Sequence, residues 1–293
     1  MSPRSGRPIL PRLRRRLHAV MHPPSLNVGH LKLGRHVTIE AGVDIDCDRL
    51  TLGDGVTIKT GTRIKMTDLT IGDYTTIGEN CVLDGTDWCR IGHNCWFGHF
   101  TIIDSLGTTR IGNNVGVGAH SQLWTHIYFG DRLLGCRFAS HRPLIIDDDV
   151  WLVGHCIVSP IHAKARSMAM VGSVVTRDME DNRLYAGTPA KDVTERLGPQ
   201  FEPRPLGVKR EMMESYLAQF RAESGCHALG LRIVDVLGPR ERGITQFSLS
   251  ERCYTKQLLP EEVQFMRFLL PTRAKFVPTA ETDWVARHLL APR

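Results

Sequence analysis

Apolar residues recur at every sixth position over most of the stretch between residues 33 and 123. The series starts at Leu33, Ile39 and Ile45 and, with slips of one or two positions, continues to Val117 and Leu123. An α-helix repeats about every 3.6 residues and a simple strand alternates every two, so neither explains this spacing. A short strand followed by a turn does explain it, and we expect each periodic side chain to point into one shared core.

A small residue, most often glycine, follows many of these apolar positions. Examples are Leu33-Gly34, Leu52-Gly53, Ile71-Gly72, Ile77-Gly78, Ile91-Gly92, Phe97-Gly98 and Ile111-Gly112. Glycine accommodates a sharp backbone corner at the least steric cost. Because one strand-and-turn unit cannot bury its apolar side alone, successive coils must stack on each other. The pattern therefore predicts a mainly β chain built on a parallel β-helix.

The rhythm is disturbed at two places. It stops at Trp124 and resumes at Ile146, so we expect the stretch from Trp124 to Pro143 to leave the solenoid as a loop. Further on, Lys164 stands where an aliphatic residue belongs, which predicts a degenerate last coil. We assign residues 27–196 to the β-helix and residues 1–26 to a basic N-terminal segment.

The six-residue period is lost from about Leu197 onward. Pro203 and Pro205 indicate a linker, after which the residue pattern predicts two helices and two strands. The predicted helices cover residues 209–223 and 260–270, and the predicted strands cover residues 229–236 and 245–254. We therefore expect a small α+β domain over residues 205–293, and we find no chemical motif in it.

Composition and charge narrow the class of protein. No apolar run approaches the roughly 20 residues that cross a bilayer, and the net charge of +6 is a modest excess. We expect no nucleic-acid partner. The arginine cluster between Arg4 and Arg16 could touch anionic lipid, but a solvated cluster is the simpler explanation and the one we favour. The eight cysteines form no CxxC pair, which favours reduced thiols in a cytoplasmic protein.

Three motifs follow the hexad array in order. The first is Trp124-Thr125-His126, the second is IIDDDVWLVG at residues 145–154, and the third is GSVVTRD at 172–178 followed by AGTPAK at 186–191. With the repeats, they resemble the hexapeptide-repeat acyltransferases, in particular the galactoside, maltose, nodulation and xenobiotic acetyltransferase branch. The resemblance covers residues 31–193. It implies a left-handed β-helix and a homotrimer with active sites between subunits.

The resemblance implies acetyl transfer from acetyl-CoA to a hydroxyl or amine of a saccharide-like acceptor. The acceptor proton requires a base, and a histidine suits that task near neutral pH. His126 stands where the family places its catalytic histidine. For the acceptor we expect contacts from His99, Tyr128 and Arg132, and Asp104 could either contact the acceptor or orient one of the histidines.

The donor requires a groove with backbone amides and a cationic end. The family's groove corresponds to Gly154 and Gly172, with Trp151 as a rigid wall, and Arg177 and Lys191 are candidates for the phosphate-rich head. Lys164 and Arg166 lie in the same late coils. Val153 and Arg177 depart from the family's usual glycine and lysine, which leaves acyl-chain preference open. No metal is expected.

Two other classes of protein remain open. A metal-dependent hydratase of the γ-carbonic-anhydrase type would use three histidines, and His93, His99, His120 and His126 are candidates, although their spacing does not match that family. A catalytically silent trimeric scaffold is the second alternative. The presence of His126 and of the Trp151 coil argues against it, because a scaffold would need neither.

Overall fold

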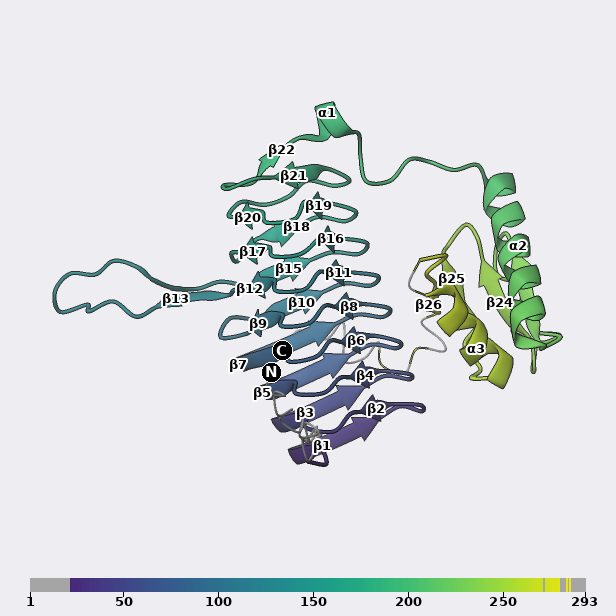
Figure 1. Ribbon diagram of the computed structural model, residues 1–293, viewed down its shortest axis with the longest axis horizontal. Coiled ribbons are helices and arrows are strands. Elements are labelled where there is room, and N and C mark those ends of the chain that lie inside the picture. The colour runs from purple at the N-terminus through teal and green to yellow at the C-terminus, as the bar shows by residue number, and fades with distance from the viewer. Residues whose placement is uncertain (1–21, 271, 280–282, 284, 286–293) are drawn as a thin grey trace, which may run out of the picture.

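The β-helix consists of stacked coils, each with three straight faces joined by corners (Figure 1). The computed structural model describes residues 22–270, 272–279, 283 and 285. Successive coils pair in parallel. In the pairing of β3 (Asp44–Leu52) with β5 (Arg63–Ile71), for example, Ile45 lies opposite Ile64 and Leu52 opposite Ile71. The predicted parallel β-helix is therefore confirmed.

Faces 1 and 2 are covered together by long bent strands in the early coils and by separate strands later. The long strands are β1 (Ser25–Leu33), β3, β5 and β7 (Val82–Ile91). From β7 upward, face 1 continues as β9 (Ile102–Asp104), β12 (Gln122–Leu123), β17 (Ile157–Val158) and β20 (Val174–Val175). Face 2 continues as β10 (Thr109–Ile111), β15 (Leu144–Ile146) and β18 (His162–Ala163).

Face 3 is a separate nine-stranded sheet. Its strands are β2 (Thr38–Ile39), β4 (Thr57–Ile58), β6 (Thr76–Ile77), β8 (Trp96–Phe97), β11 (Gly116–Val117), β16 (Trp151–Leu152), β19 (Met168–Ala169), β21 (Leu184–Ala186) and β22 (Lys191–Asp192). We call the corner between faces 1 and 2 the first corner, that between faces 2 and 3 the second, and that between faces 3 and 1 the third. Because the coils stack in register, residues at equivalent corners form columns.

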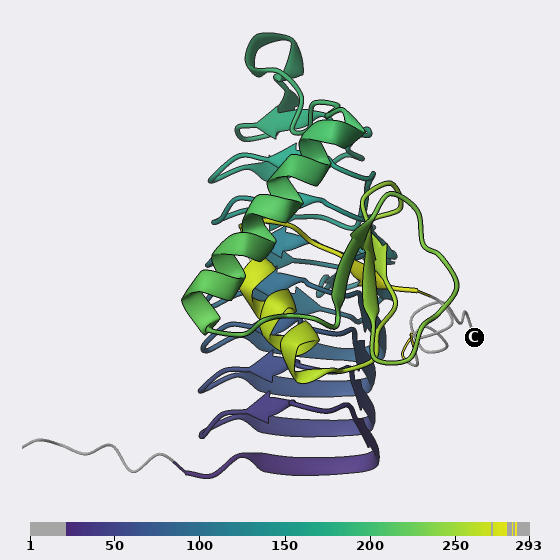
Figure 2. The same ribbon diagram turned by 90° about the vertical axis from the view of Figure 1, so that its right-hand side faces the viewer.

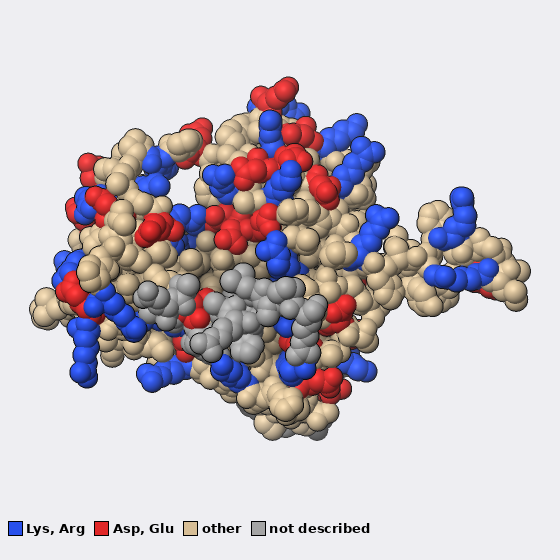
Figure 3. Space-filling view, turned by 180° about the vertical axis from the view of Figure 1, so that it is seen from behind, with Lys and Arg blue, Asp and Glu red and all other residues tan. Residues whose placement is uncertain are grey.

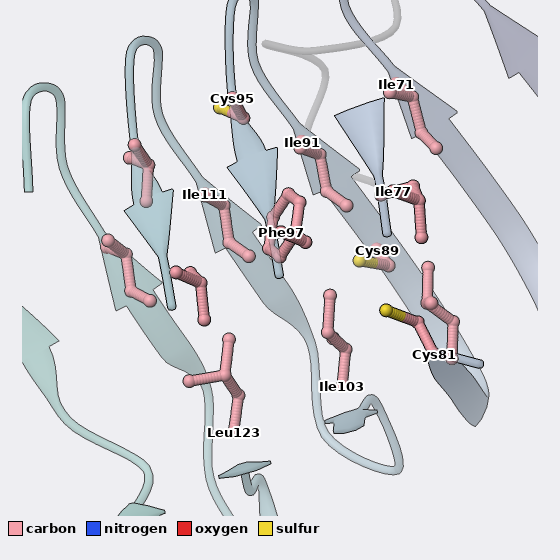
Figure 4. Close-up of a cluster of buried hydrophobic side chains, with 14 of the residues drawn as sticks. Ile71, Ile77, Cys81, Cys89, Ile91, Cys95, Phe97, Ile103, Ile111 and Leu123 are labelled. Carbon is pink, nitrogen blue, oxygen red and sulfur yellow. The ribbon is translucent and has the colours of Figure 1, made fainter. Parts of the chain in front are cut away.

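The periodic apolar residues fill the interior, as predicted. Ile77, Phe97 and Ile111 are almost fully buried and, in Figure 4, point inward from successive coils toward their neighbours. The glycines that follow them allow the coils to approach. A Cβ atom at Gly72 would lie 2.6 Å from the carbonyl carbon of Gly92 in the next coil, a separation too short for any side chain. The glycine pattern therefore reflects the close stacking of backbones.

The late coil that we expected to be degenerate is regular. Ala163 and Ala169 point inward and are buried, and β18 and β19 pair with the coil below in register. Lys164 lies at the second corner, where its ammonium is 2.5 Å from Glu180. The prediction was wrong because small alanines fill this part of the core, and the apolar period alone did not identify them.

The expected loop leaves the solenoid at the first corner. Its base is an antiparallel hairpin of β13 (His126–Tyr128) and β14 (Ala139–His141), in which His126 lies opposite His141. Beyond this hairpin the loop projects away from the coils (Figure 1).

The chain after the β-helix forms α1 (Thr194–Leu197), an extended linker and the predicted α+β fold. Its elements are α2 (Leu206–Ser224), β23 (Leu231–Val234), β24 (Thr245–Ser248), β25 (Cys253–Tyr254), α3 (Pro260–Leu269) and β26 (Val277–Pro278). Both expected helices form. The single strand expected over residues 245–254 is instead two antiparallel strands, with Phe247 opposite Tyr254, because the chain turns at 249–252.

The C-terminal domain packs against the second corner (Figures 1 and 2). The buried ammonium of Lys256 lies 2.7 Å from Asp54 and 2.5 Å from Asp73, two carboxylates of successive coils. Burial alone would lower the pKa of Lys256, but the two carboxylates outweigh it and raise the pKa, which keeps the side chain charged. Arg252 holds Asp149 through two hydrogen bonds of 2.7 and 2.9 Å. These contacts join the domain to several coils at once.

All eight cysteines are free thiols. None of the helices in the described part of the chain is long and apolar enough to cross a membrane. The arginine cluster of the basic N-terminal segment lies outside the described residues, so the preference for a solvated cluster over lipid contact stays a prediction.

We predict that replacing Lys256 by methionine lowers the free energy of unfolding by about 3–5 kcal/mol. The variant would remove the ammonium that lies 2.7 Å from the buried Asp54 carboxylate and 2.5 Å from that of Asp73. Denaturant unfolding at pH 7 measures the loss. The matched control is Arg232→Met, which breaks an exposed ion pair with Glu241 and should cost under about 1 kcal/mol. Equal losses in the two variants would contradict the prediction.

Candidate active site

The histidine–aspartate pair at the first corner is the centre of the candidate site. Asp104 ends β9 on face 1, and His126 begins the hairpin that leaves the next coil. The Nδ1 atom of His126 lies 2.9 Å from the Asp104 carboxylate. The aspartate side chain is 8% exposed and the imidazole 22%. The pair therefore has a buried carboxylate beneath a histidine that solvent can reach.

Thr125 fixes the position of the Asp104 carboxylate. Its backbone N–H donates a 2.9 Å hydrogen bond to the same carboxylate oxygen that faces His126, and its hydroxyl donates to that oxygen as well. The hydroxyl in turn accepts a 2.9 Å hydrogen bond from the Gly107 amide. The carboxylate oxygen thus faces three donors and has little freedom to turn away from the histidine.

This hydrogen bonding determines the neutral form of His126. A carboxylate accepts hydrogen bonds, so the Nδ1 atom of the imidazole carries the proton and Nε2 keeps its lone pair. The rings of Trp124 and His141 meet the imidazole edge to face, with centroids 6.1 and 6.3 Å away. An imidazole held in this way is suited to accept a proton at Nε2.

Two of the predicted acceptor residues gather near His126. Tyr128 is on the same strand, and its ring meets His141 at a centroid distance of 5.7 Å. The Arg132 guanidinium lies 6.0 Å from the centre of the Tyr128 ring. The hairpin therefore places aromatic rings next to His126, and the loop beyond it brings a guanidinium near the Tyr128 ring.

The remainder of the loop presents apolar side chains to solvent. Figure 3 shows it as a largely uncharged projection with a few basic groups. The exposed apolar side chains are Ile127, Phe129, Leu133, Leu134 and Phe138. Exposed apolar surface of this extent is typical of an interaction site.

The structure does not bring His99 to this pair within one chain. His99 lies at the third corner, at the opposite end of face 1 from Asp104. Its Nδ1 atom accepts a 3.2 Å hydrogen bond from the Glu79 amide. The turn at Phe100 and the strand β9 separate His99 from Asp104. Of the two histidines that Asp104 could orient, it contacts His126.

The predicted donor-binding residues occupy the late coils and do not all meet. Gly154 and Gly172 are neighbours at the third corner, and Trp151 precedes them on face 3, 46% exposed. Arg177 lies at the first corner and Lys191 on β22, both exposed. The Gly172 amide donates to the Gly154 carbonyl at 2.9 Å. That amide is therefore paired within the solenoid, and donor binding at Gly154 and Gly172 stays a prediction.

Lys164 and Arg166 are also less suited to the donor than expected. Each forms an ion pair at the second corner, with Glu180 at 2.5 Å and Asp181 at 2.8 Å respectively. Thr125 is the residue whose role the sequence analysis missed. It was visible only as part of the Trp-Thr-His motif, and its contact with Asp104 depends on the stacking register of two coils.

The histidines considered for a metal site lie at three different corners. His93 is buried at the second corner, His99 and His120 belong to the third, and His126 leaves the first. Among the residues that the structure describes, no three histidine, cysteine or acidic side chains are grouped for a metal ion. These four histidines therefore do not meet one another within the described part of one chain.

Comparison with known proteins gives several partial matches. No family model matches the chain. It is 36% identical over 105 residues to a Schizosaccharomyces pombe protein named as an acetyltransferase. The aligned region covers 34% of this chain and 47% of that protein. It is 30% identical over 123 residues to the galactoside O-acetyltransferase of Lactococcus lactis, covering 39% and 59% respectively. The chain thus spans about half to three-fifths of these relatives.

Solved structures give weaker likenesses. The polysialic acid O-acetyltransferase OatWY matches with a TM-score of 0.47 and 15% identity, over 63% of this chain and 92% of that one. AntD, an N-acyltransferase from Bacillus cereus, matches with a TM-score of 0.44 and 16% identity, over 64% and 92%. By its hexad-built β-helix and its curated relatives, the chain resembles the hexapeptide-repeat acyltransferases.

Proposed function

We propose that this chain is an acetyl-CoA-dependent acyltransferase that modifies a hydroxyl or amine of a saccharide-like acceptor, with His126 as the general base. The observation that carries the proposal is the bond between His126 and the buried Asp104 carboxylate at the base of the projecting loop. The names of the curated relatives, which include a galactoside O-acetyltransferase, support acetyl transfer to a sugar.

The proposed reaction follows from the form of His126 described above. The Nε2 atom takes the acceptor's proton while the acceptor oxygen or nitrogen attacks the thioester carbonyl. The new bond to the acetyl carbon forms, the carbon–sulfur bond breaks, and the proton passes from His126 to the departing thiolate. Asp104 stabilises the positive charge that the imidazole carries between these steps.

Acetyl-CoA supplies the activated acetyl group when it is bound. Trp151 offers an exposed ring on face 3, and Ile157 adds exposed apolar surface on face 1, past the third corner. These side chains suit a pantetheine arm. Arg177 and Lys191 remain the candidates for the phosphate-rich head, since Lys164 and Arg166 are already paired.

The acceptor would bind against the hairpin. Tyr128 and His141 present ring faces and edges, and Arg132 adds hydrogen-bond donors. Aromatic faces combined with a few polar groups suit a sugar, whose rings have both apolar and hydroxylated surfaces.

A homotrimer completes this proposal. In one chain the base lies at the first corner and Trp151 beside the third, with face 1 between them. A second copy can supply the missing half if the exposed apolar loop of one subunit rests on the late coils of its neighbour. Burial of Phe129, Leu133 and Leu134 would then stabilise the assembly.

The hydrogen bonds predict different neutral tautomers for His126 and His93. His126 should carry its proton on Nδ1, which faces Asp104, whereas His93 should carry it on Nε2, because its Nδ1 accepts from the Asp73 amide at 2.8 Å. Imidazole ¹⁵N NMR of the protein at pH 8 measures both, with His126→Gln and His93→Gln used for assignment. A proton on Nε2 of His126 would contradict its role as base.

The catalytic role predicts a selective loss of rate. His126→Ala should lower kcat by about 10²- to 10⁴-fold while acetyl-CoA binding is kept. Thiol release from acetyl-CoA with a panel of sugars and amino sugars measures the rate, and calorimetry measures donor binding.

The matched control is His162→Ala. His162 also pairs with a carboxylate, Asp147 at 2.7 Å, but on face 2 and away from the loop. Its variant should keep the wild-type rate. Equal activity of the His126 and His162 variants would exclude His126 as the base, and failure of the wild type to bind acetyl-CoA would exclude the donor.

A further inference from the structure

A second candidate site lies where the C-terminal domain meets the first coils. A cleft of about 440 Å³ is lined by residues of both parts of the chain. The β-helix contributes Lys32, Arg35 and Asp54, and the C-terminal domain contributes Arg240, Lys256 and Gln257. This volume is within the range of small-molecule sites, roughly 300–1,000 Å³.

The cleft carries more positive than negative charge. The Lys256 ammonium at its floor is balanced by Asp54 and Asp73. Arg35, in the turn after β1, and Arg240, between β23 and β24, are both exposed. Among the described residues, neither guanidinium has a carboxylate partner. Lys32 adds a further cation to the lining.

Convergence of these cations from two domains favours an anion between them. Arg35 and Arg240 line the same cleft, and an anion bound there would lower the repulsion between their guanidinium groups. Their planar N–H donors match the oxygens of a phosphate in pairs, and the nearby ammonium favours the same charge. An anion with several oxygens could therefore contact both domains at the same time.

We propose that this cleft binds a small phosphate-bearing anion, of the size of a pyrophosphate group or a sugar phosphate, and that the bound anion fastens the C-terminal domain to the first coils. The site is separate from the candidate active site, because it lies at the second corner near β1 whereas His126 leaves the first corner several coils above. The proposal does not rest on acyl transfer.

The test uses the full chain and pyrophosphate as the probe. Calorimetry measures the affinity, and thermal unfolding with and without pyrophosphate measures the stabilisation. Saturating pyrophosphate should raise Tm by roughly 5 °C. Sodium chloride at the same ionic strength should not reproduce this shift.

The variant Arg35→Ala/Arg240→Ala should bind pyrophosphate about 100-fold more weakly, since each lost charged hydrogen-bond donor weakens binding about tenfold. The control Arg63→Ala/Arg196→Ala removes the same charge from exposed positions elsewhere and should bind as the wild type does. Arg35→Lys/Arg240→Lys, which keeps the charge and removes the paired donors, should give an intermediate affinity.

Three results would overturn the proposal. They are the absence of pyrophosphate binding to the wild type, equal affinity in the wild type and the cleft variant, and an equal Tm shift with sodium chloride. If the alanine variant does not fold, the lysine variant decides. Unchanged affinity in that variant would show that the guanidinium groups do not contact the anion.

Discussion

Stacking of coils in register is the constraint on which the rest of this structure depends. Each coil buries its apolar residues only against the coil above and below it, so the backbones must approach closely, as at Gly72 and Gly92. Residues far apart in sequence are thereby held in columns at fixed spacing. The candidate active site uses one such column, in which Asp104 lies in the coil beneath Thr125 and His126.

The three corners of the solenoid contact different parts of the structure. The second corner is a column of polar groups that the C-terminal domain covers, through Lys256 and Arg252. The loop projects from the first corner, and Gly154 and Gly172 lie at the third. The described part of the C-terminal domain and the loop lie on opposite sides of the solenoid (Figure 1), so this part of the domain does not cover the loop.

The sequence was most informative where one local rule determines the structure. The apolar period identified the inward residues and the break at Trp124 identified the loop, since both depend on burial alone. The apolar period did not identify Ala163 as an inward residue, because a small side chain fills the core at that position. The single strand expected over residues 245–254 is two strands joined by a turn, because β-propensity alone does not predict where a strand is interrupted by a turn.

Within the candidate site, only part could be predicted. His126 and Asp104 were both candidates, but their contact depends on the register between two coils, and so does the part played by Thr125. His99 is close to Asp104 in sequence and yet lies at another corner, because β9 runs along face 1 between the two corners. The hydrogen bond from the Gly172 amide to the Gly154 carbonyl likewise depends on the stacking of two coils.

The most direct test of the central claim is a crystal structure of the protein with bound coenzyme A. The account predicts the thiol sulfur within roughly 3.5 Å of His126 Nε2, with the pantetheine arm beside Trp151 of an adjacent subunit. A thiol beyond the reach of His126, even through one bridging water, would contradict the assignment of this histidine–aspartate pair as the catalytic centre.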